Sequence, residues 1–365
     1  MSDCVPTPEQ VDRRLRQMLA ADSRQTGDAA HTDRLMLMLT RSCELRCAYC
    51  FVGLTEEAYG EDHPGVPTVG VPRGDMSAAT ARRAVDHLMS SPKPRLALQL
   101  FGGEPTRRWE RVVQVLEYAR SHPHLGGRAL AIQLTTNGFG VDPERLAVLA
   151  SAGVTVQLSV DGAGRANRFR RLHVGEQVEA DRTWERTIHT LRSGTARWFL
   201  NATLPPAAFG ELPLRWADAV ALGVPAVQLN YTTGMAVSPA QFRAWCEGLA
   251  AVLRSARTGG PACFNRQAAA DPAPLCGDVL CDVDGTLLQI GGIFHEARFP
   301  GLRAAYTHGH VATAPRWEGH RATLAELWRR TRAALAGDDL AVFVAGMRLG
   351  AASDLVARAV AAEAR

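Results

Sequence analysis

Short apolar runs and amphipathic stretches alternate along most of this chain. From residue 35 onwards, each apolar run is followed by a turn rich in glycine or polar residues, and then by a stretch with apolar residues about every 3.6 positions. The apolar runs predict strands at residues 35–40, 96–101, 130–135, 154–160, 198–203 and 226–231. The periodic stretches predict helices at about 77–90, 107–121, 143–152, 181–194, 211–222 and 239–255.

This succession of strand–helix units predicts an α/β fold. Parallel strands joined by helical crossovers wind with one hand and curl toward a barrel, and six such units leave the barrel incomplete. We therefore expect a partial (β/α)6 barrel over residues 35–255. Residues 1–34 should form an N-terminal helix, near 8–21, and a linker, at 22–32.

The repeat stops after about residue 256. Gly259-Gly260-Pro261 breaks the pattern, and Asp284-Gly285 lies between two apolar runs, which is typical of a hairpin turn. Two further helices are expected at roughly 320–336 and 338–363. Residues 256–365 are therefore predicted to form a small irregular C-terminal extension followed by helices.

Charge and hydropathy exclude two classes of partner. The 365 residues carry 41 Lys and Arg against 37 Asp and Glu, and these charges are dispersed rather than gathered in basic runs, which argues against nucleic-acid binding. No run approaches the roughly 18 uninterrupted apolar residues of a membrane helix. The N-terminal residues also lack a signal-peptide pattern. We therefore expect no membrane association and a cytoplasmic location.

Three of the eight cysteines follow the first predicted strand directly. Cys43, Cys47 and Cys50 form a C-x-x-x-C-x-x-C motif. Thiolates are the usual ligands of iron–sulfur clusters, and three cysteines on one tight loop can hold three irons of a cubane while the fourth iron stays open. On spacing alone, two alternatives remain: a zinc site that lacks its fourth ligand, and unrelated buried cysteines.

Other polar signals lie at the ends of the next predicted strands. They are Gly102-Gly103-Glu104-Pro105, Thr136-Asn137-Gly138 and the segment 159–162. Active sites of parallel α/β folds are assembled at the carboxyl edge of the sheet. These segments and the cysteine motif should therefore meet at one mouth of the barrel.

The cysteine motif, with an aromatic residue before its third cysteine, and the Gly-Gly-Glu-Pro segment together resemble the radical S-adenosylmethionine (SAM) superfamily. The resemblance covers roughly residues 35–235. It implies a 4Fe-4S cluster held by Cys43, Cys47 and Cys50, whose open iron binds SAM and whose electron generates a 5′-deoxyadenosyl radical. It also implies a flavodoxin- or ferredoxin-type electron donor.

The same resemblance assigns SAM-binding roles. Gly102, Gly103 and Glu104 correspond to the segment that contacts the SAM amino group, with Glu104 as the acceptor. Tyr49 corresponds to the aromatic residue whose main chain contacts adenine. The ribose and methionine portions are assigned to Asn137 and Ser159, and the methionine carboxylate to Arg170, with Arg168 or Arg171 as alternatives.

The later cysteines form a second group, Cys263, Cys276 and Cys281. Leu275-Cys276-Gly277 and the following Asp284-Gly285 hairpin resemble the start of a SPASM or shortened twitch module, which implies an auxiliary cluster on these three cysteines. The alternative is a degenerate module whose thiols merely pack. Ile290 stands where the family hairpin ends in cysteine, so a complete two-cluster module cannot form.

The next residue, Gly291, stands where related anaerobic sulfatase maturases carry an acidic base. This difference argues against formylglycine formation and favours crosslinking, epimerisation or another oxidation of a ribosomal peptide. We therefore predict a peptide-modifying radical SAM oxidoreductase. The alternatives are a radical SAM enzyme with a small-molecule substrate and a noncatalytic metal-binding protein. The substrate, the atom attacked, whether SAM is consumed or regenerated, and the oligomeric state are not predicted.

Overall fold

A computed structural model provides the structure of this chain. It describes residues 4–21, 32–50, 52, 74–170, 177–267, 272, 274–276, 278–293, 299–314, 316–317 and 322–363. Most of the expected linker at 22–32, and Arg171, lie outside the described residues.

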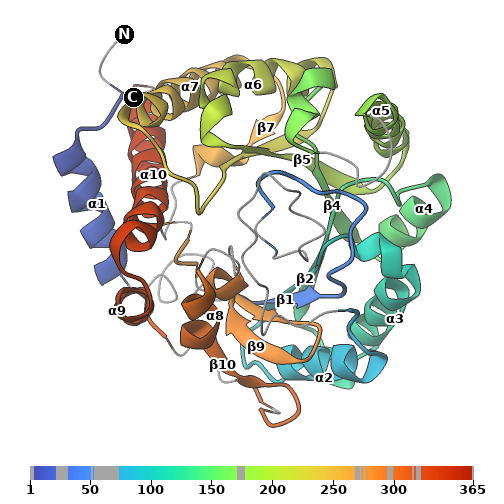
Figure 1. Cartoon of the computed structure of the whole chain (residues 1–365). Coiled ribbons are helices and arrows are strands. Elements are labelled where there is room, and N and C mark those ends of the chain that lie inside the picture. The colour runs from blue at the N-terminus through green and yellow to red at the C-terminus, as the bar shows by residue number, and fades with distance from the viewer. Residues whose placement is uncertain are drawn as a thin grey trace.

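The described strands form one sheet in the order β10-β9-β8-β1-β2-β3-β4-β5-β6-β7, which curves around a central space (Figure 1). Neighbouring strands from β8 through β1 to β7 are parallel, whereas β8–β9 and β9–β10 are antiparallel. The strands are β1 (Thr32–Met38), β2 (Arg95–Phe101), β3 (Ala129–Thr136), β4 (Val154–Ser159), β5 (Arg197–Leu204), β6 (Ala226–Tyr231), β7 (Ala262–Cys263), β8 (Val279–Cys281), β9 (Thr286–Gln289) and β10 (Thr307–His310).

Helices cover the outer face of this curved sheet (Figure 1). Side-chain caps fix several of their starts: Thr7 and Ser238 form capping boxes, and Ser77, Asp142 and Thr323 each accept a backbone N–H. The α-helices are α1 (Pro8–Ala20), α2 (Ala78–Met89), α3 (Trp109–Arg120), α4 (Pro143–Ser151), α5 (Gln177–Ser193), α6 (Leu212–Ala221), α7 (Pro239–Thr258), α8 (Pro300–Tyr306), α9 (Leu324–Ala334) and α10 (Gly337–Ala362).

The six predicted strands and their helices are confirmed as a partial barrel of the α/β class, with ends that differ by a few residues. The main difference lies in the C-terminal extension. The Asp284-Gly285 turn forms the expected hairpin, and β8 pairs in parallel with β1. The sheet therefore runs across the boundary expected at residues 255 and 256, and places the extension directly beside the cysteine loop that follows β1.

The C-terminal helix α10 packs against α1 and α7. It is the one described helix long and apolar enough to cross a membrane by length and composition, a property that the search for uninterrupted apolar runs missed. More than half of its most apolar window is buried within the protein. It also carries the fully buried Asp354 side chain, which pairs with Arg14 of α1 at 2.6 Å. We conclude that α10 is a core helix.

Candidate functional site

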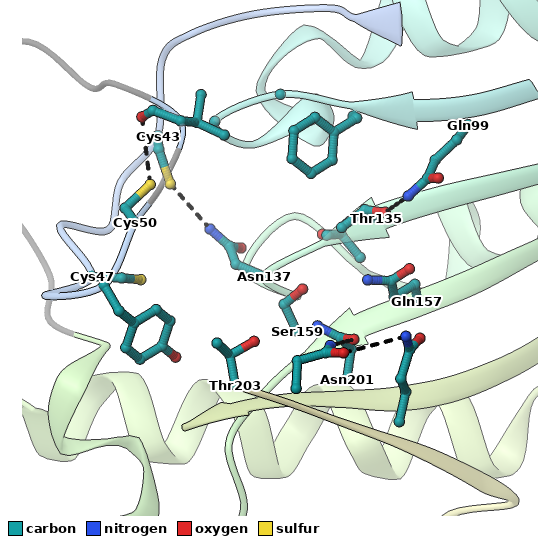
Figure 2. A pocket seen from close by; sticks show the side chains of 18 of the residues that line it. Cys43, Cys47, Cys50, Gln99, Thr135, Asn137, Gln157, Ser159, Asn201 and Thr203 are labelled. Atoms are coloured by element: carbon teal, nitrogen blue, oxygen red, sulfur yellow. Dashed lines mark hydrogen bonds between the residues drawn. The ribbon is translucent and has the colours of Figure 1, made fainter. Parts of the chain in front are cut away.

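A cavity of about 410 Å³ opens inside the barrel at the carboxyl ends of the strands. Its size suits one drug-sized ligand. In Figure 2, the three cysteines of the first motif lie at one end, and side chains from β2 to β5 form the opposite wall. Of the residues assigned to the SAM site, the lining includes Cys43, Cys47, Tyr49, Cys50, Gly102, Gly103, Asn137, Ser159 and Arg170.

The cysteine loop supplies hydrogen-bond donors to its own sulfurs. The backbone N–H of Leu45 donates to Cys43 Sγ at 3.3 Å. The Asn137 side chain, from the end of β3, donates to the same sulfur at 3.6 Å (Figure 2). Donors of this kind stabilise sulfur ligands and tune iron–sulfur clusters. Asn137 therefore faces the expected cluster as well as the expected SAM site.

Two guanidinium groups counteract the rise in thiol pKa that burial causes. Burial raises the pKa of Cys47 to about 12, against a lowering effect from Arg170. Burial likewise raises the pKa of Cys50 to about 11, against lowering effects from the Val52 backbone, Arg170 and Arg41. Three converging thiols, N–H donors to sulfur and nearby cations are the environment that an anionic iron–sulfur cluster requires, so these residues fit one.

Gly102 and Gly103 hold the cysteine loop by close backbone contact. Gly103 N donates to Thr40 O, and Glu104 N donates to Ser42 O, both at 2.8 Å. A Cβ atom on Gly102 would lie 2.4 Å from Thr40 O, and one on Gly103 would lie 2.4 Å from Ser42 O. The glycines were expected to permit close approach to SAM. The structure shows that they also permit close approach of the loop that carries Cys43.

Replacing Gly103 by alanine is therefore expected to displace the cysteine loop. The Cβ atom would overlap backbone oxygen, which cannot rotate away as a side chain does. Iron content after anaerobic reconstitution should fall at least about fivefold, for a cost near 1 kcal/mol or more. The matched control is Gly210→Ala, because a Cβ atom there meets nothing within 4 Å. Equal iron contents in the two variants would contradict this role.

The structure corrects the role expected for Glu104. Its side chain is 0% exposed and does not line the cavity. One carboxylate oxygen accepts from Thr106 N at 3.0 Å, Thr106 Oγ1 at 2.6 Å and Thr136 Oγ1 at 2.8 Å, and the other accepts from Asn137 N at 2.6 Å. Glu104 therefore ties the end of β2 to the end of β3, and it does so from outside the cavity lining.

Burial raises the pKa of Glu104 to about 7, reinforced by the nearby Glu44 and opposed by the Thr106 and Asn137 donors. Although this pKa lies near neutrality, we assign Glu104 a structural role, because its carboxyl group links the ends of β2 and β3. The backbone of the turn, rather than the Glu104 side chain, reaches the cavity.

Asp161 is a positioning residue that sequence reasoning interpreted only as part of a turn. Its carboxylate accepts from the Tyr49 hydroxyl and, at 3.0 Å, from Thr203 N, and it pairs with Arg170 Nε at 3.0 Å. The Arg170 guanidinium also lies 5.3 Å from the centre of the Tyr49 ring. Asp161 therefore fixes two of the expected SAM-site residues against each other. Its only sequence signal was its place directly after a strand end.

Desolvation alone would lower the pKa of Arg170, but Asp161, Tyr49 and Cys47 together outweigh it and raise that pKa, so Arg170 stays cationic. Its side chain lines the cavity. The alternative Arg168 instead pairs with Glu211 at 2.6 Å. Because Arg170 lines the cavity and Arg168 does not, Arg170 is the better placed of the two to bind a carboxylate there. Ser159 faces the cavity at the end of β4, between Asn137 and Asn201 (Figure 2).

A buried ion cluster links the cysteine loop to the C-terminal extension. Arg41, two residues before Cys43, donates from Nη2 to Asp282 Oδ2 at 2.6 Å and from Nε to Asp282 Oδ1 at 3.2 Å. Arg303 of α8 donates to the same carboxylate at 2.7 Å. Asp282 is 0% exposed. Its sequence context, between a predicted strand and a turn, gave no sign of this partnership.

The structure does not bring the later cysteines together, which corrects the expected ligand set of an auxiliary cluster. Cys263 on β7 and Cys281 on β8 are separated in the sheet by β1 to β6. Cys281 pairs with Leu37 on the outer, helix-covered face, whereas Cys276, like Cys50, packs against the inner cluster that contains Met36. Successive side chains of a strand point to opposite faces, so spacing along the chain did not predict proximity.

Within the described residues, no three His, Cys, Asp or Glu side chains are arranged to hold one metal ion. Neither cysteine triplet is an exception. A single zinc ion draws its ligands to one centre, whereas a cubane binds each cysteine through a different iron. The position of Cys43, Cys47 and Cys50 around one end of a cavity is compatible with a cluster.

Comparisons with known proteins agree with this geometry. Residues 37–193 match the family model of the radical SAM superfamily. The AdoMet-dependent heme synthase of Methanosarcina barkeri is 30% identical over 217 residues, which cover 56% of this chain and 54% of that protein. The chain thus spans about half the length of this curated relative.

Two solved structures share the fold. One is anSMEcpe with AdoMet and the Kp18Cys peptide bound, which has a TM-score of 0.60 and 13% identity over 83% of each chain. The other is Streptococcus suis SuiB bound to S-adenosylmethionine, with a TM-score of 0.52 and 11% identity over 78% of this chain and 64% of that one. At these identities the likeness is one of fold.

Proposed function

We propose that this chain, a member of the radical SAM superfamily, generates a 5′-deoxyadenosyl radical from SAM and uses it to abstract hydrogen from a peptide. One observation carries the proposal: Cys43, Cys47 and Cys50 share a single cavity with the Gly102-Gly103 turn and the residues at the ends of β3 and β4. A cluster and a SAM molecule that contact each other need these residues around one cavity.

A 4Fe-4S cluster on the three cysteines would supply the electron that cleaves the sulfonium carbon–sulfur bond of SAM and leaves methionine and the radical. The chain itself binds and orients. Arg170, kept cationic by Asp161, is suited to the methionine carboxylate. The backbone of Gly102 and Gly103, which lines the cavity, is suited to the amino group, and Asn137 and Ser159 to the ribose and methionine portions. A flavodoxin- or ferredoxin-type protein is the electron donor we expect.

Support for a peptide comes from two sources. The hairpin of β8 and β9 lies beside β1, where a twitch-like module would approach the cavity. The shared fold with anSMEcpe, which binds a peptide, is consistent with that branch. Gly291 is packed so that a Cβ atom would lie 2.7 Å from both Pro274 O and Tyr306 Cε2, which leaves no room for an acidic side chain. We therefore favour crosslinking, epimerisation or another oxidation over formylglycine formation.

A small-molecule substrate is the second candidate, and one observation favours it: the curated relative at 30% identity is named as a heme synthase. Mass analysis separates the two candidates. Incubation with the product of a neighbouring short precursor gene should yield a peptide that has lost two hydrogens, as crosslinking or oxidation requires. An unaltered peptide beside steady deoxyadenosine formation would favour the small molecule.

Anaerobic reconstitution tests the radical chemistry itself. We expect roughly four irons per chain, one cubane, and 5′-deoxyadenosine after addition of SAM and a strong reductant. About eight irons would show a second cluster and contradict the separation of Cys263, Cys276 and Cys281. Zinc in place of iron, with no deoxyadenosine, would support a noncatalytic metal-binding protein.

A further inference from the structure

Side chains that face the barrel interior lie in layers below the cysteine loop. Residues two apart along a strand point to the same face and are about 7 Å apart. Ser159 and Thr203 lie near the carboxyl ends of β4 and β5, and Gln157 and Asn201 lie two residues earlier on the same strands and therefore deeper in the barrel. In Figure 2, the deeper side chains lie at the far end of the cavity from the cysteines.

Six carboxamides project from the inner face of the sheet into the cavity, and together they form what we call the amide floor. They come from five neighbouring strands and all line the cavity. Its members are Gln99 on β2, Gln133 on β3, Gln157 on β4, Asn201 on β5, and Gln228 and Asn230 on β6. Such a concentration of amide groups inside a barrel is costly unless their hydrogen bonds are satisfied.

The hydrogen bonds among these carboxamides occupy either the amino group or the carbonyl group, but not both, of four of the six side chains. Gln133 Nε2 donates to Gln157 Oε1, and Asn230 Nδ2 donates to Asn201 Oδ1 at 2.6 Å. Gln228 Nε2 donates to Asn230 Oδ1 at 3.3 Å. Four groups have no side-chain hydrogen-bond partner within the described residues. They are the amino groups of Gln157 and Asn201 and the carbonyls of Gln133 and Gln228. None of these four groups is among the fully buried polar atoms without a partner, so they reach the cavity.

The cavity is lined by hydrogen-bond donors and acceptors, few of which carry a charge. Of its described lining residues, Arg34 and Arg170 carry the formal charges, and none is a carboxylate. Arg170 is paired with Asp161, and Arg34 lies 3.8 Å from Asp278. The amide floor itself is neutral.

Space for a second molecule lies beneath. A further cavity of about 340 Å³, toward the amino ends of the strands, shares Arg34, Gln99, Gln133, Phe199 and Gln228 with the first. The upper cavity has the volume of one drug-sized ligand, and SAM is such a ligand. Additional room for a substrate is therefore at the floor and below it.

We infer that the amide floor binds an uncharged peptide segment through the segment's carboxamide side chains. Such groups present a donor and an acceptor side by side, which match the open amino and carbonyl halves of the floor. A carboxylate would lose its hydration and meet the carbonyls of Gln133 and Gln228, which cannot donate to it. This inference rests on the proposed function and names its substrate class.

Binding without turnover tests this inference. The probes are acetyl-Ala-Gln-Ala-amide and acetyl-Ala-Glu-Ala-amide, titrated at neutral pH into reconstituted protein with SAM present and reductant withheld. The neutral probe should bind about tenfold more tightly, the discrimination expected from one unsatisfied buried polar group. Gln157→Glu and Gln133→Glu each place a carboxylate in the floor, which should repel the acidic probe and enlarge this preference at least several-fold while SAM affinity is retained. Gln114→Glu, on the exposed face of α3, is the matched control and should change nothing.

Equal or tighter binding of the acidic probe would overturn the inference, since it would show that Arg34 rather than the amide floor sets the preference. Failure of both probes to bind would also overturn it. Neither result depends on radical formation, because no reductant is present, and deoxyadenosine formation measured separately decides the proposed function.

Discussion

Replacement of Cys43, Cys47 and Cys50 together by alanine is expected to lower the iron content of reconstituted protein from about four atoms per chain to near zero. Cluster binding needs all three thiolates, because each holds a different iron. SAM-dependent deoxyadenosine should become undetectable at the same time. Iron analysis, absorbance of the cluster and product quantification after reduction measure the three consequences.

Two cysteine controls separate cluster loss from general damage. Cys246→Ala removes a buried thiol on α7 that does not line the cavity, and its iron content should stay near that of the wild type. The triple replacement of Cys263, Cys276 and Cys281 should also retain about four irons. If that second triple variant instead lost iron while the first kept it, the cluster would belong to the C-terminal extension, and the proposed site would be wrong.

Asp282→Ala is expected to lower the free energy of unfolding by about 3–5 kcal/mol, the usual cost of removing one partner from a buried ion pair. The variant leaves the guanidinium groups of Arg41 and Arg303 without the carboxylate that lies between them. Urea denaturation followed by circular dichroism gives the difference. Asp284→Asn is the matched control, since Asp284 is exposed in the adjacent turn and should change stability by less than about 0.5 kcal/mol.

The same carboxylate predicts a direction for pH dependence. Desolvation raises the pKa of Asp282, but Arg41 and Arg303 outweigh it and hold that pKa below its ordinary value. A carboxyl group with a lowered folded-state pKa contributes stability above its unfolded pKa, near 3.9, and this contribution is lost as pH falls through the folded pKa. Acid unfolding of the wild type should therefore show a stability loss below about pH 4 that is absent from Asp282→Ala.

The ion cluster should also affect the site. Arg41 lies two residues before Cys43, and its charge counteracts the raised pKa of Cys50. If Asp282→Ala remains folded, the cysteine loop should be less well held, and iron content should fall together with stability. A stable variant with unchanged iron would show that Arg41 keeps its place without Asp282.

Local patterns in the sequence were sufficient for the six central strands, their helices and the cysteine loop. Hydrophobic periodicity reports which residues face a core, and the spacing of Cys43, Cys47 and Cys50 places three thiols on one short loop whatever surrounds it. Strand ends carry active-site residues in parallel folds, so the meeting of this loop with Gly102, Gly103 and Asn137 was also predictable.

The roles of individual polar side chains were not predictable in the same way. Glu104 was expected to face SAM, but Thr136 and Asn137, more than thirty residues away, take up its carboxylate. Asp161 was noted only within the segment 159–162, and Asp282 was not singled out. Their partners, such as Tyr49 and Arg41, lie 112 and 241 residues away along the chain.

The sequence by itself thus determined the class of fold and the loop that offers three thiols to a cluster, because both depend on short-range periodicity and spacing. Only the tertiary structure decided which face of the sheet each later cysteine occupies, that β8 pairs beside β1, and that six carboxamides from five strands meet as the amide floor. These features depend on strand register and on contacts between distant segments, and the direction of a strand side chain reverses with a shift of one residue.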